Sequence, residues 1–190
     1  MAKTRHLNRE KVVEAAINLA QKEAGVEHLT LAKLAATLDV RTPSLYNHIK
    51  SNDDLRQAMA LWGLQTLLAD MQTACLGQVG RLALMSVFKT YRKFAHQYPA
   101  IYPLMLRAPL PDDVEHNAVS NQFVQLMLLL VASCGLAGDE ALHVVRGLRS
   151  LAHGFISLEL AGGFGLDLSL DDSYSQMLHT FLTGLGFPDE

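Results

Sequence analysis

The sequence has little cysteine and no apolar run long enough to cross a membrane. Only Cys75 and Cys134 are present, which excludes a disulfide framework and a thiolate ligand cluster and makes a reducing cytoplasm the expected compartment. The first ten residues, MAKTRHLNRE, contain no apolar segment, so no signal peptide is expected. The longest apolar run, Leu126 to Gly138, is shorter than the roughly 20 residues of a membrane span. It predicts a buried helix and no membrane partner.

The motifs of common enzyme classes are missing as well. The sequence contains no P-loop, no dinucleotide fingerprint and no nucleophile elbow. Among the eight histidines, His143, His153 and His179 have neither metal-ligand spacing nor a paired carboxylate motif, so we expect no metal and no cofactor. Cys134 precedes Gly135 in an apolar segment, which disfavours a reactive thiolate. The sequence therefore predicts no catalytic residues and a protein that is not an enzyme.

Helical periodicity, by contrast, runs through almost the whole chain. Its 190 residues are 49% hydrophobic and 18% charged, as in a globular protein with a sizeable core. Apolar residues recur at spacings of three and four, and no alternating strand pattern occurs, so the predicted fold is all-α. Side-chain caps are expected at Asn8, at Thr30, at Thr42 before Pro43, and at Ser51 or Asn52. The later helices are expected at 81–97, 99–107, 112–135, 139–161 and 171–185.

Charge divides the chain into two unequal parts. Residues 1–62 hold nine Lys/Arg against seven Asp/Glu, a difference of +2, whereas residues 63–190 hold seven against twelve, a difference of −5. A mildly basic head on an acidic body points to a polyanion that contacts the head. The composition also becomes more apolar after Gly77 and Gly80. These changes predict two domains, residues 1–62 and 63–190.

The segment from Thr30 to Lys50 predicts a helix-turn-helix. Two short helices are joined by the tight turn Asp39-Val40-Arg41, and the second, 42–50, is rich in hydrogen-bonding side chains. Leu45 and Ile49 lie four residues apart and would anchor this helix to the core. A helix that projects outward in this way can enter a DNA major groove, where side chains meet base edges and phosphates. A merely solvated helix face is the alternative, which the proline-led start and the tight turn disfavour.

The candidate DNA-binding residues follow from this arrangement. Base contacts are expected from Thr42, Pro43, Ser44 and Asn47, because proline can pack on a thymine methyl and asparagine can pair with adenine. Phosphate contacts are expected from the side chains of Tyr46, His48, Lys50 and Thr30, which carry hydroxyl, imidazole or amine groups. The full candidate set is Thr30, Arg41, Thr42, Pro43, Ser44, Tyr46, Asn47, His48 and Lys50.

The stretch LTLAKLAATLDVRTPSLYNHIKSNDDL, from Leu29 to Leu55, resembles the DNA-binding domain of the TetR-like family of bacterial transcriptional regulators, with a match over roughly residues 8–62. The resemblance implies a homodimeric repressor that leaves a palindromic double-stranded operator when an unidentified small-molecule inducer binds the C-terminal domain. It also implies that Tyr46 and His48 touch the operator backbone. Two positions depart from the family pattern. Asp39 replaces a usual glycine, and Asn52 replaces a usual lysine.

A dimer surface is expected on the last two helices. Small side chains recur along helix 139–161 and would allow another helix to approach closely, and helix 171–185 carries an apolar stripe. Packing within one subunit is the alternative for the small residues. The interface candidates are Gly147, Ser150, Gly154, Ser157, Ala161, Tyr174, Met177, Leu178 and Phe181.

An inducer cavity would be built by the middle helices of the second domain. Aromatic and methionine side chains are the adaptable candidates, although most such residues are ordinary core. Glu159 shares an apolar helix arc with Phe155, so its carboxylate must be paired, exposed at the helix end, or part of a ligand site. The candidates are Met85, Phe88, Tyr91, Tyr102, Met105, Arg107, Phe123, Met127, Phe155 and Glu159. The remaining alternative is a helical homodimer that binds a small molecule, or is structural, without reading DNA.

Overall fold

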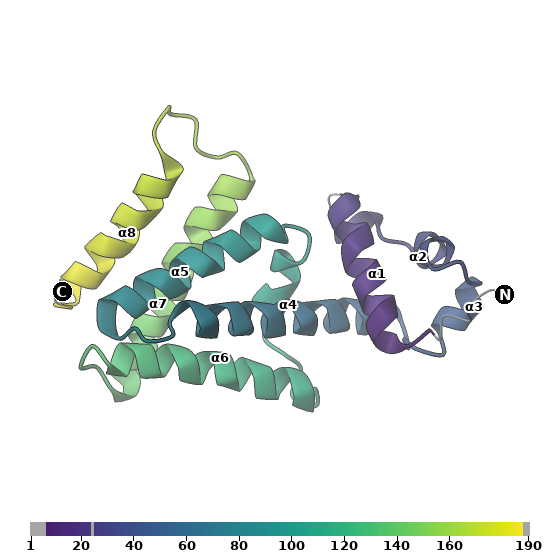
Figure 1. Ribbon diagram of the computed structural model, residues 1–190, viewed down its shortest axis with the longest axis horizontal. Coiled ribbons are helices and arrows are strands. Elements are labelled where there is room, and N and C mark those ends of the chain that lie inside the picture. Colours follow the sequence, from purple (N-terminus) through teal and green to yellow (C-terminus); the bar gives the residue numbers. More distant parts are fainter. Residues whose placement is uncertain (1–6, 24, 188–190) are drawn as a thin grey trace. The chain divides into compact units, whose positions relative to one another are not determined.

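A computed structural model of the chain describes residues 7–23 and 25–187, and all regular structure in these residues is helical (Figure 1). The α-helices are α1 (Arg9–Lys22), α2 (Leu31–Thr37), α3 (Thr42–Leu45), α4 (Asn52–Ala74), α5 (Gly80–Gln97), α6 (Val114–Ala132), α7 (Gly138–Leu160) and α8 (Leu170–Gly184). Two 3₁₀ helices, η1 (Val26–His28) and η2 (Tyr102–Leu106), complete the set. The all-α prediction is confirmed. Within the same residues, no helix is both long enough and apolar enough to cross a membrane.

Side-chain caps start the helices of the amino-terminal region where the sequence predicts them. Asn8 Oδ1 accepts the Lys11 N–H at 2.9 Å, and Thr30 Oγ1 accepts the Lys33 N–H at 3.2 Å. Ser51 Oγ accepts the Asp54 N–H at 3.1 Å, which decides between the two expected caps of α4. Each cap satisfies an amide that has no partner inside its own helix.

The third helix is shorter than predicted and begins differently. The structure has a helix of four residues, Thr42–Leu45, in place of the expected 42–50. A 3₁₀-type turn follows, in which the His48 N–H donates to the Leu45 carbonyl three residues back, at 2.8 Å. Arg41, not Thr42, occupies the cap position, and it makes no side-chain cap bond. Pro43 remains in the first turn, where its missing N–H leaves no intrahelical bond unmade.

Two later segments also differ from their predicted bounds. The expected helix 99–107 is the 3₁₀ helix Tyr102–Leu106, because Pro103 lacks the N–H that a continuous α-helix needs. The expected helix 112–135 is α6, Val114–Ala132, which begins after the cap Asp113. Gly135 adopts a φ of +92° beyond the end of α6, a conformation that stops the helix.

The chain forms two compact units. The first consists of the described residues up to Gln65 together with Tyr98–Ala108, and the second of Thr66–Gln97 with the described residues from Pro109 onward. Helix α4 contributes its first part to one unit and its last part to the other. The predicted boundary at 62/63 did not anticipate that Tyr98–Ala108 belongs with the first unit. The outer ends of both predicted domains, 1–6 and 188–190, lie outside the described residues.

The first unit encloses a core between α1, α2, the end of α3 and the start of α4. This core comprises Val12, Ala16, Leu34, Leu45, Ile49, Leu55 and Met59, each at most 1% exposed. The segment Tyr98–Ala108 packs on the same unit, where the Trp62 and Tyr98 rings meet edge to face at 5.1 Å. The Ala100 N–H also donates to Gln21 Oε1 of α1 at 3.0 Å.

The second unit is a helical bundle around α5 and α7. Helix α5 contacts α6, α7 and α8, and α7 contacts α6 and α8. Helices α7 and α8 run side by side and are joined by the loop 161–169 (Figure 1). Tyr174 of α8 is buried against α5, where its O–H donates to the Phe88 carbonyl at 2.9 Å. The C-terminal end of α8 is held by the buried Arg81, which donates to the His179 and Phe187 carbonyls.

Candidate DNA-binding and dimer surfaces

The turn between α2 and α3 has the tight geometry that a helix-turn-helix needs. Asp39 adopts a φ of +55°, and no other non-glycine residue in the described part of the chain has a positive φ. The Val40 N–H closes the turn by donating to the Ala35 carbonyl at 3.0 Å. Aspartate tolerates this left-handed conformation better than most residues, although glycine does so without strain. The departure at Asp39 therefore leaves the turn intact.

The segment 41–50 has one buried side and one accessible side. Leu45 and Ile49 are 0% and 1% exposed, which confirms that this pair anchors α3 to the core. Tyr46 is 56% exposed. Among the other candidates, Thr30, Arg41, Pro43, Asn47 and Lys50 are exposed, and Thr42, Ser44 and His48 are half-buried. All nine are accessible to a partner at least in part, and their individual roles on DNA stay predictions.

An ion pair that the sequence did not reveal holds the end of this segment. Arg9 of α1 donates to both carboxylate oxygens of Asp54 at 2.8 Å and to the His48 carbonyl at 2.9 Å. Asp54 Oδ2 also accepts the Lys50 N–H at 2.7 Å. The hydrogen bonds from Arg9, aided by the Lys50 N–H, lower the pKa of Asp54 to about 2. The partners lie 45 residues apart, so no local pattern links them.

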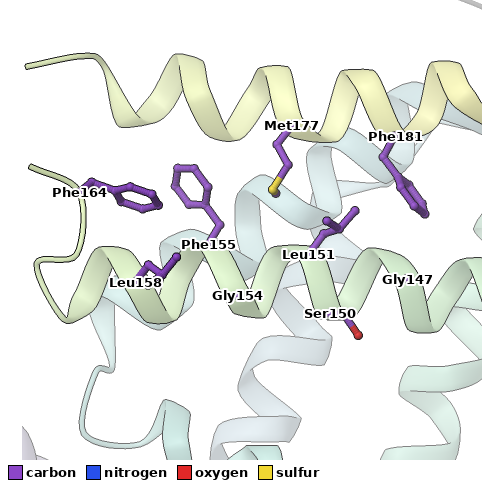
Figure 2. Close-up of a pocket in the computed structure, with 9 residues that line it drawn as sticks. All are labelled: Gly147, Ser150, Leu151, Gly154, Phe155, Leu158, Phe164, Met177 and Phe181. Atoms are coloured by element: carbon purple, nitrogen blue, oxygen red, sulfur yellow. The ribbon is translucent and has the colours of Figure 1, made fainter. Parts of the chain in front are cut away.

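A groove of about 610 Å³ lies between α7 and α8 on the second unit (Figure 2). Met177 and Phe181 reach into it from α8, while Phe155 of α7 meets the Phe164 ring from the connecting loop at 4.8 Å. Its lining consists of Gly147, Ser150, Leu151, Gly154, Phe155, Leu158, Phe164, Met177 and Phe181, in which Ser150 is the one polar side chain. A second hollow of about 400 Å³ adjoins it and shares Leu151, Met177 and Phe181. The result is an accessible apolar surface.

The predicted dimer residues divide between this groove and the core. Gly147, Ser150, Gly154, Met177 and Phe181 line the groove, while Ser157 is half-buried and Ala161 exposed. Tyr174 and Leu178 are 1% and 0% exposed, so their assignment to a dimer interface is wrong. Helix α8 has two apolar faces, and these two residues belong to the face that packs inside the subunit.

The two groove glycines have different surroundings. A Cβ added at Gly147 would lie 2.9 Å from Phe181 Cζ of the same subunit, so this glycine makes room for an internal contact. A Cβ at Gly154 would meet nothing within 4 Å. Internal packing, the alternative reading of the small residues, thus accounts for Gly147 and leaves Gly154 without an internal explanation.

The ligand candidates are not gathered into one site. In the second unit Phe88, Tyr91 and Met127 are buried, and Met85 and Phe123 are half-buried. Tyr102 and Met105 are buried in the first unit. Arg107 directly follows the last residue of η2 and is exposed. Phe155 lines the α7–α8 groove and contacts the Tyr174 ring at 5.1 Å, and its role in ligand binding stays a prediction.

Glu159 is occupied by an ion-pair network. Arg92 of α5 donates to its two oxygens at 2.8 and 2.5 Å, and His96 Nε2 lies 2.8 Å from Oε2. Arg92 also bonds to Asp171 at the start of α8 at 2.6 Å. Hydrogen bonds from Arg92 hold the pKa of Glu159 below its usual value despite burial. Of the three alternatives for this carboxylate, pairing is the one observed, and a ligand contact at Glu159 is not supported.

The groove includes three residues that sequence reasoning missed. Leu151 and Leu158 each lie four positions after a groove glycine, so the same helical periodicity could have found them. Phe164 comes from the loop 161–169, where no periodicity applies. It therefore had no signal in the sequence.

Similarity to known proteins agrees with this architecture. Residues 84–181, just over half of the chain, match the family described as "Tetracyclin repressor-like, C-terminal domain". The chain is 36% identical to the uncharacterized HTH-type transcriptional regulator YobS of Bacillus subtilis, covering 94% of this chain and 93% of that protein. It is 30% identical to the uncharacterized HTH-type transcriptional regulator Rv0681 of Mycobacterium tuberculosis, covering 97% and 84%.

A solved structure shares the fold. A TetR variant from Acinetobacter baumannii, determined in complex with minocycline, superposes with a TM-score of 0.70 at 20% identity, covering 95% of this chain and 97% of that one. The same family is indicated by the helix-turn-helix of the first unit, by the helical second unit and by relatives that match along most of the chain. The chain belongs to the TetR-like family of ligand-responsive bacterial transcriptional regulators.

Proposed function

We propose that the protein is a cytoplasmic homodimer that binds a palindromic operator through the segment 41–50 of each subunit and is released when a small molecule binds the second unit. The observation that carries this proposal is the two-sided character of that segment. Leu45 and Ile49 fix it to the core, and the hydroxyl, amide, imidazole and amine side chains before, between and after them remain accessible. This is the arrangement that major-groove reading requires.

A second copy of the chain is the proposed occupant of the α7–α8 groove. An apolar groove of about 610 Å³ is costly to leave in water, and the loop that supplies its Phe164 also exposes Leu166 and Leu168. A twofold contact would cover the same surface on both subunits. A dimer would also bring two first units to the DNA at once, which adds to the few contacts that one short helix can make with a half-site.

Release requires that the ligand distinguish two arrangements of the protein. Helix α4 begins at Asn52, two positions after the end of the segment 41–50, which we call the recognition segment, and it continues into the second unit. A ligand bound there can displace this helix and change the spacing of the two heads. Only a difference in affinity for the two arrangements shifts the equilibrium, because tight but equal binding shifts nothing.

Selection of bound sequences from random duplexes is the most direct test of the DNA-binding proposal. We expect a recovered palindrome whose half-sites lie about one helical turn apart. The Tyr46→Ala variant should bind every duplex more weakly, since it removes a phosphate contact, while Ser44→Ala and Asn47→Ala should change the preferred bases. Recovery of no common sequence, or equal losses for every duplex in all three variants, would refute the base-reading assignment.

The dimer proposal has its own test. Gly154 lines the groove with open space around it, so the Gly154→Arg variant should keep the fold of the subunit and yet obstruct the contact. Gln125→Arg is the control for a new surface arginine, because Gln125 is exposed on α6 and lies outside the groove. Light scattering after size-exclusion chromatography should show dimers for the wild type and the control and monomers for Gly154→Arg. Dimers in all three would mean that another surface mediates association.

A further inference from the structure

We propose that the ion pair between Arg9 and Asp54 is a positioning clasp that sets the recognition segment 41–50 for base reading, an inference that rests on the proposed function. The first observation is geometric. The Arg9 guanidinium bonds to both oxygens of Asp54 and to the His48 carbonyl, while Asp54 accepts the Lys50 N–H. One ion pair thereby fixes two backbone groups at the end of the segment.

The segment gains from such a support because two of its own backbone hydrogen bonds are long, although the Ser44 and His48 amides bond at 2.8 Å. Helix α3 has only four residues, and an isolated helix of that length is unstable. The next two amides bond at the long end of the range, Tyr46 N–H to the Pro43 carbonyl at 3.3 Å and Asn47 N–H to the Ser44 carbonyl at 3.4 Å. Leu45 and Ile49 set the depth of the segment in the core. The clasp adds a polar anchor at its far end, next to the candidates Asn47 and His48.

The geometry of the pair suits positioning. Two parallel bonds between a guanidinium and a carboxylate fix direction as well as distance. The Arg9 side chain is 48% exposed and that of Asp54 19%, so the pair lies at the surface of the head and not in its core. The sequence has no acidic side chain between Asp39 and Asp53. The Asp54 carboxylate therefore lies beside a segment whose own polar side chains can donate hydrogen bonds.

The sign of the change in DNA affinity when the Asp54 carboxylate is neutralised tests the proposal. A carboxylate near the proposed phosphate-contacting surface opposes DNA binding, so its neutralisation should, by charge alone, strengthen binding to every duplex. If Asp54 positions the segment, neutralisation should instead weaken binding to the operator relative to other sequences. The two roles therefore predict opposite changes.

The experiment compares Asp54→Asn with Glu23→Gln in the full-length chain. Glu23 is the matched control, because it also forms an ion pair in the first unit, with Lys33 Nζ at 2.6 Å, but does not touch segment 41–50. Dissociation constants for the selected operator and for a random duplex are measured by fluorescence anisotropy at one salt concentration. We expect Asp54→Asn to lower the ratio of operator to random affinity at least about fivefold, the effect of losing one good base contact. Glu23→Gln should leave that ratio unchanged.

A second variant separates positioning from folding. Arg9→Lys keeps the charge but cannot bond to Asp54 and to the His48 carbonyl with a planar fork. In Arg9→Lys the ratio of operator to random affinity should fall, as it does in Asp54→Asn. Helix content and the unfolding transition are measured to show that both variants remain folded at the assay temperature. Faster amide hydrogen exchange at Lys50 in both variants, with unchanged exchange in α1, is the expected physical signature.

The outcomes separate this inference from the function on which it rests. A wild-type chain that prefers no duplex refutes the proposed function, and this inference with it. A wild-type chain that prefers the operator, together with an Asp54→Asn variant that binds all duplexes equally more tightly, refutes the clasp alone. An unchanged operator ratio in Arg9→Lys has the same meaning. A reduced ratio in both variants supports the clasp.

Discussion

The Arg9–Asp54 pair has a counterpart in the second unit, where breaking the ion pair between Arg92 and Glu159 should have a large effect on stability. The two side chains are 16% and 7% exposed, so the substitution Arg92→Met strands a carboxylate that is almost fully buried. Loss of one partner from a buried pair costs roughly 3–5 kcal/mol. His96 remains 2.8 Å from the same carboxylate and can supply part of the lost stabilisation. We therefore expect a loss of about 3 kcal/mol in the free energy of unfolding at pH 7.

The double variant Arg92→Met/Glu159→Leu shows whether the stranded charge is the cause. Replacing both partners by apolar side chains of similar volume is often close to neutral, so the double variant should recover most of the stability that Arg92→Met loses. Asp171, the other partner of Arg92, is 85% exposed and stays hydrated when Arg92 is removed. Urea unfolding followed by circular dichroism, at equal protein concentration, gives the free energies to compare.

The same pair predicts a pH dependence. The pKa of Glu159 is lowered in the folded protein, chiefly by the hydrogen bonds from Arg92. The unfolded chain therefore takes up a proton at higher pH than the folded one. The stability due to this pair is present above the ordinary glutamate pKa and is lost as the pH falls through the lower, folded value. The difference between the wild type and Arg92→Met should shrink over that range.

Two results would contradict this reasoning. A loss below about 1 kcal/mol in Arg92→Met would mean that the pair behaves as a solvated surface contact. A double variant as unstable as Arg92→Met would assign the loss to packing. Arg92 lies over the Phe155 and Tyr174 rings at 5.9 and 5.2 Å from their centroids, and a methionine would not reproduce those contacts.

Three further substitutions test the local structure by thermal unfolding. Asp39→Gly should stabilise the head by about 0.5–1 kcal/mol, because glycine adopts the positive φ without strain, and a loss would contradict that explanation. Gly63→Ala should destabilise by about 1 kcal/mol, since its Cβ would lie 2.7 Å from Met105 Sδ and 2.8 Å from Ile101 Cγ2, which outweighs the gain in helix propensity; a stabilised variant would show that these side chains move aside. Tyr174→Phe should cost about 1 kcal/mol through the lost hydrogen bond to Phe88, and an unchanged transition would show that the bond contributes nothing.

Features written in neighbouring residues were predictable from the sequence. The caps Asn8 and Thr30 act on amides three residues away, and the burial of Leu45 and Ile49 follows from one turn of helix. The turn at Asp39 was predictable because the segment between two short helices allows nothing longer. In each case the causes lie within a few residues, where helical geometry fixes which side chains meet.

Features that depend on distant parts of the chain were not predictable. Periodicity placed Tyr174 and Met177 on one apolar stripe, but it cannot tell which side of a helix meets the core and which meets a partner. The stripe is wide enough to serve both. Glu159 was recognisable as a carboxylate that needed a partner, yet Arg92 lies 67 residues earlier. No spacing rule connects two side chains that meet only after the bundle has formed.

The position of Asp54 connects the two proposals. It lies in the first turn of α4, where its N–H donates to the cap Ser51 Oγ and its carboxylate accepts hydrogen bonds from Arg9 and the Lys50 N–H. The same helix continues past Gln65 into the second unit. A displacement of the start of α4 would therefore pull directly on the backbone at Lys50 and, through Arg9, on the His48 carbonyl. If this contact sets segment 41–50 as proposed, a ligand that acts on α4 would alter base reading within each subunit as well as the spacing between the two DNA-binding units.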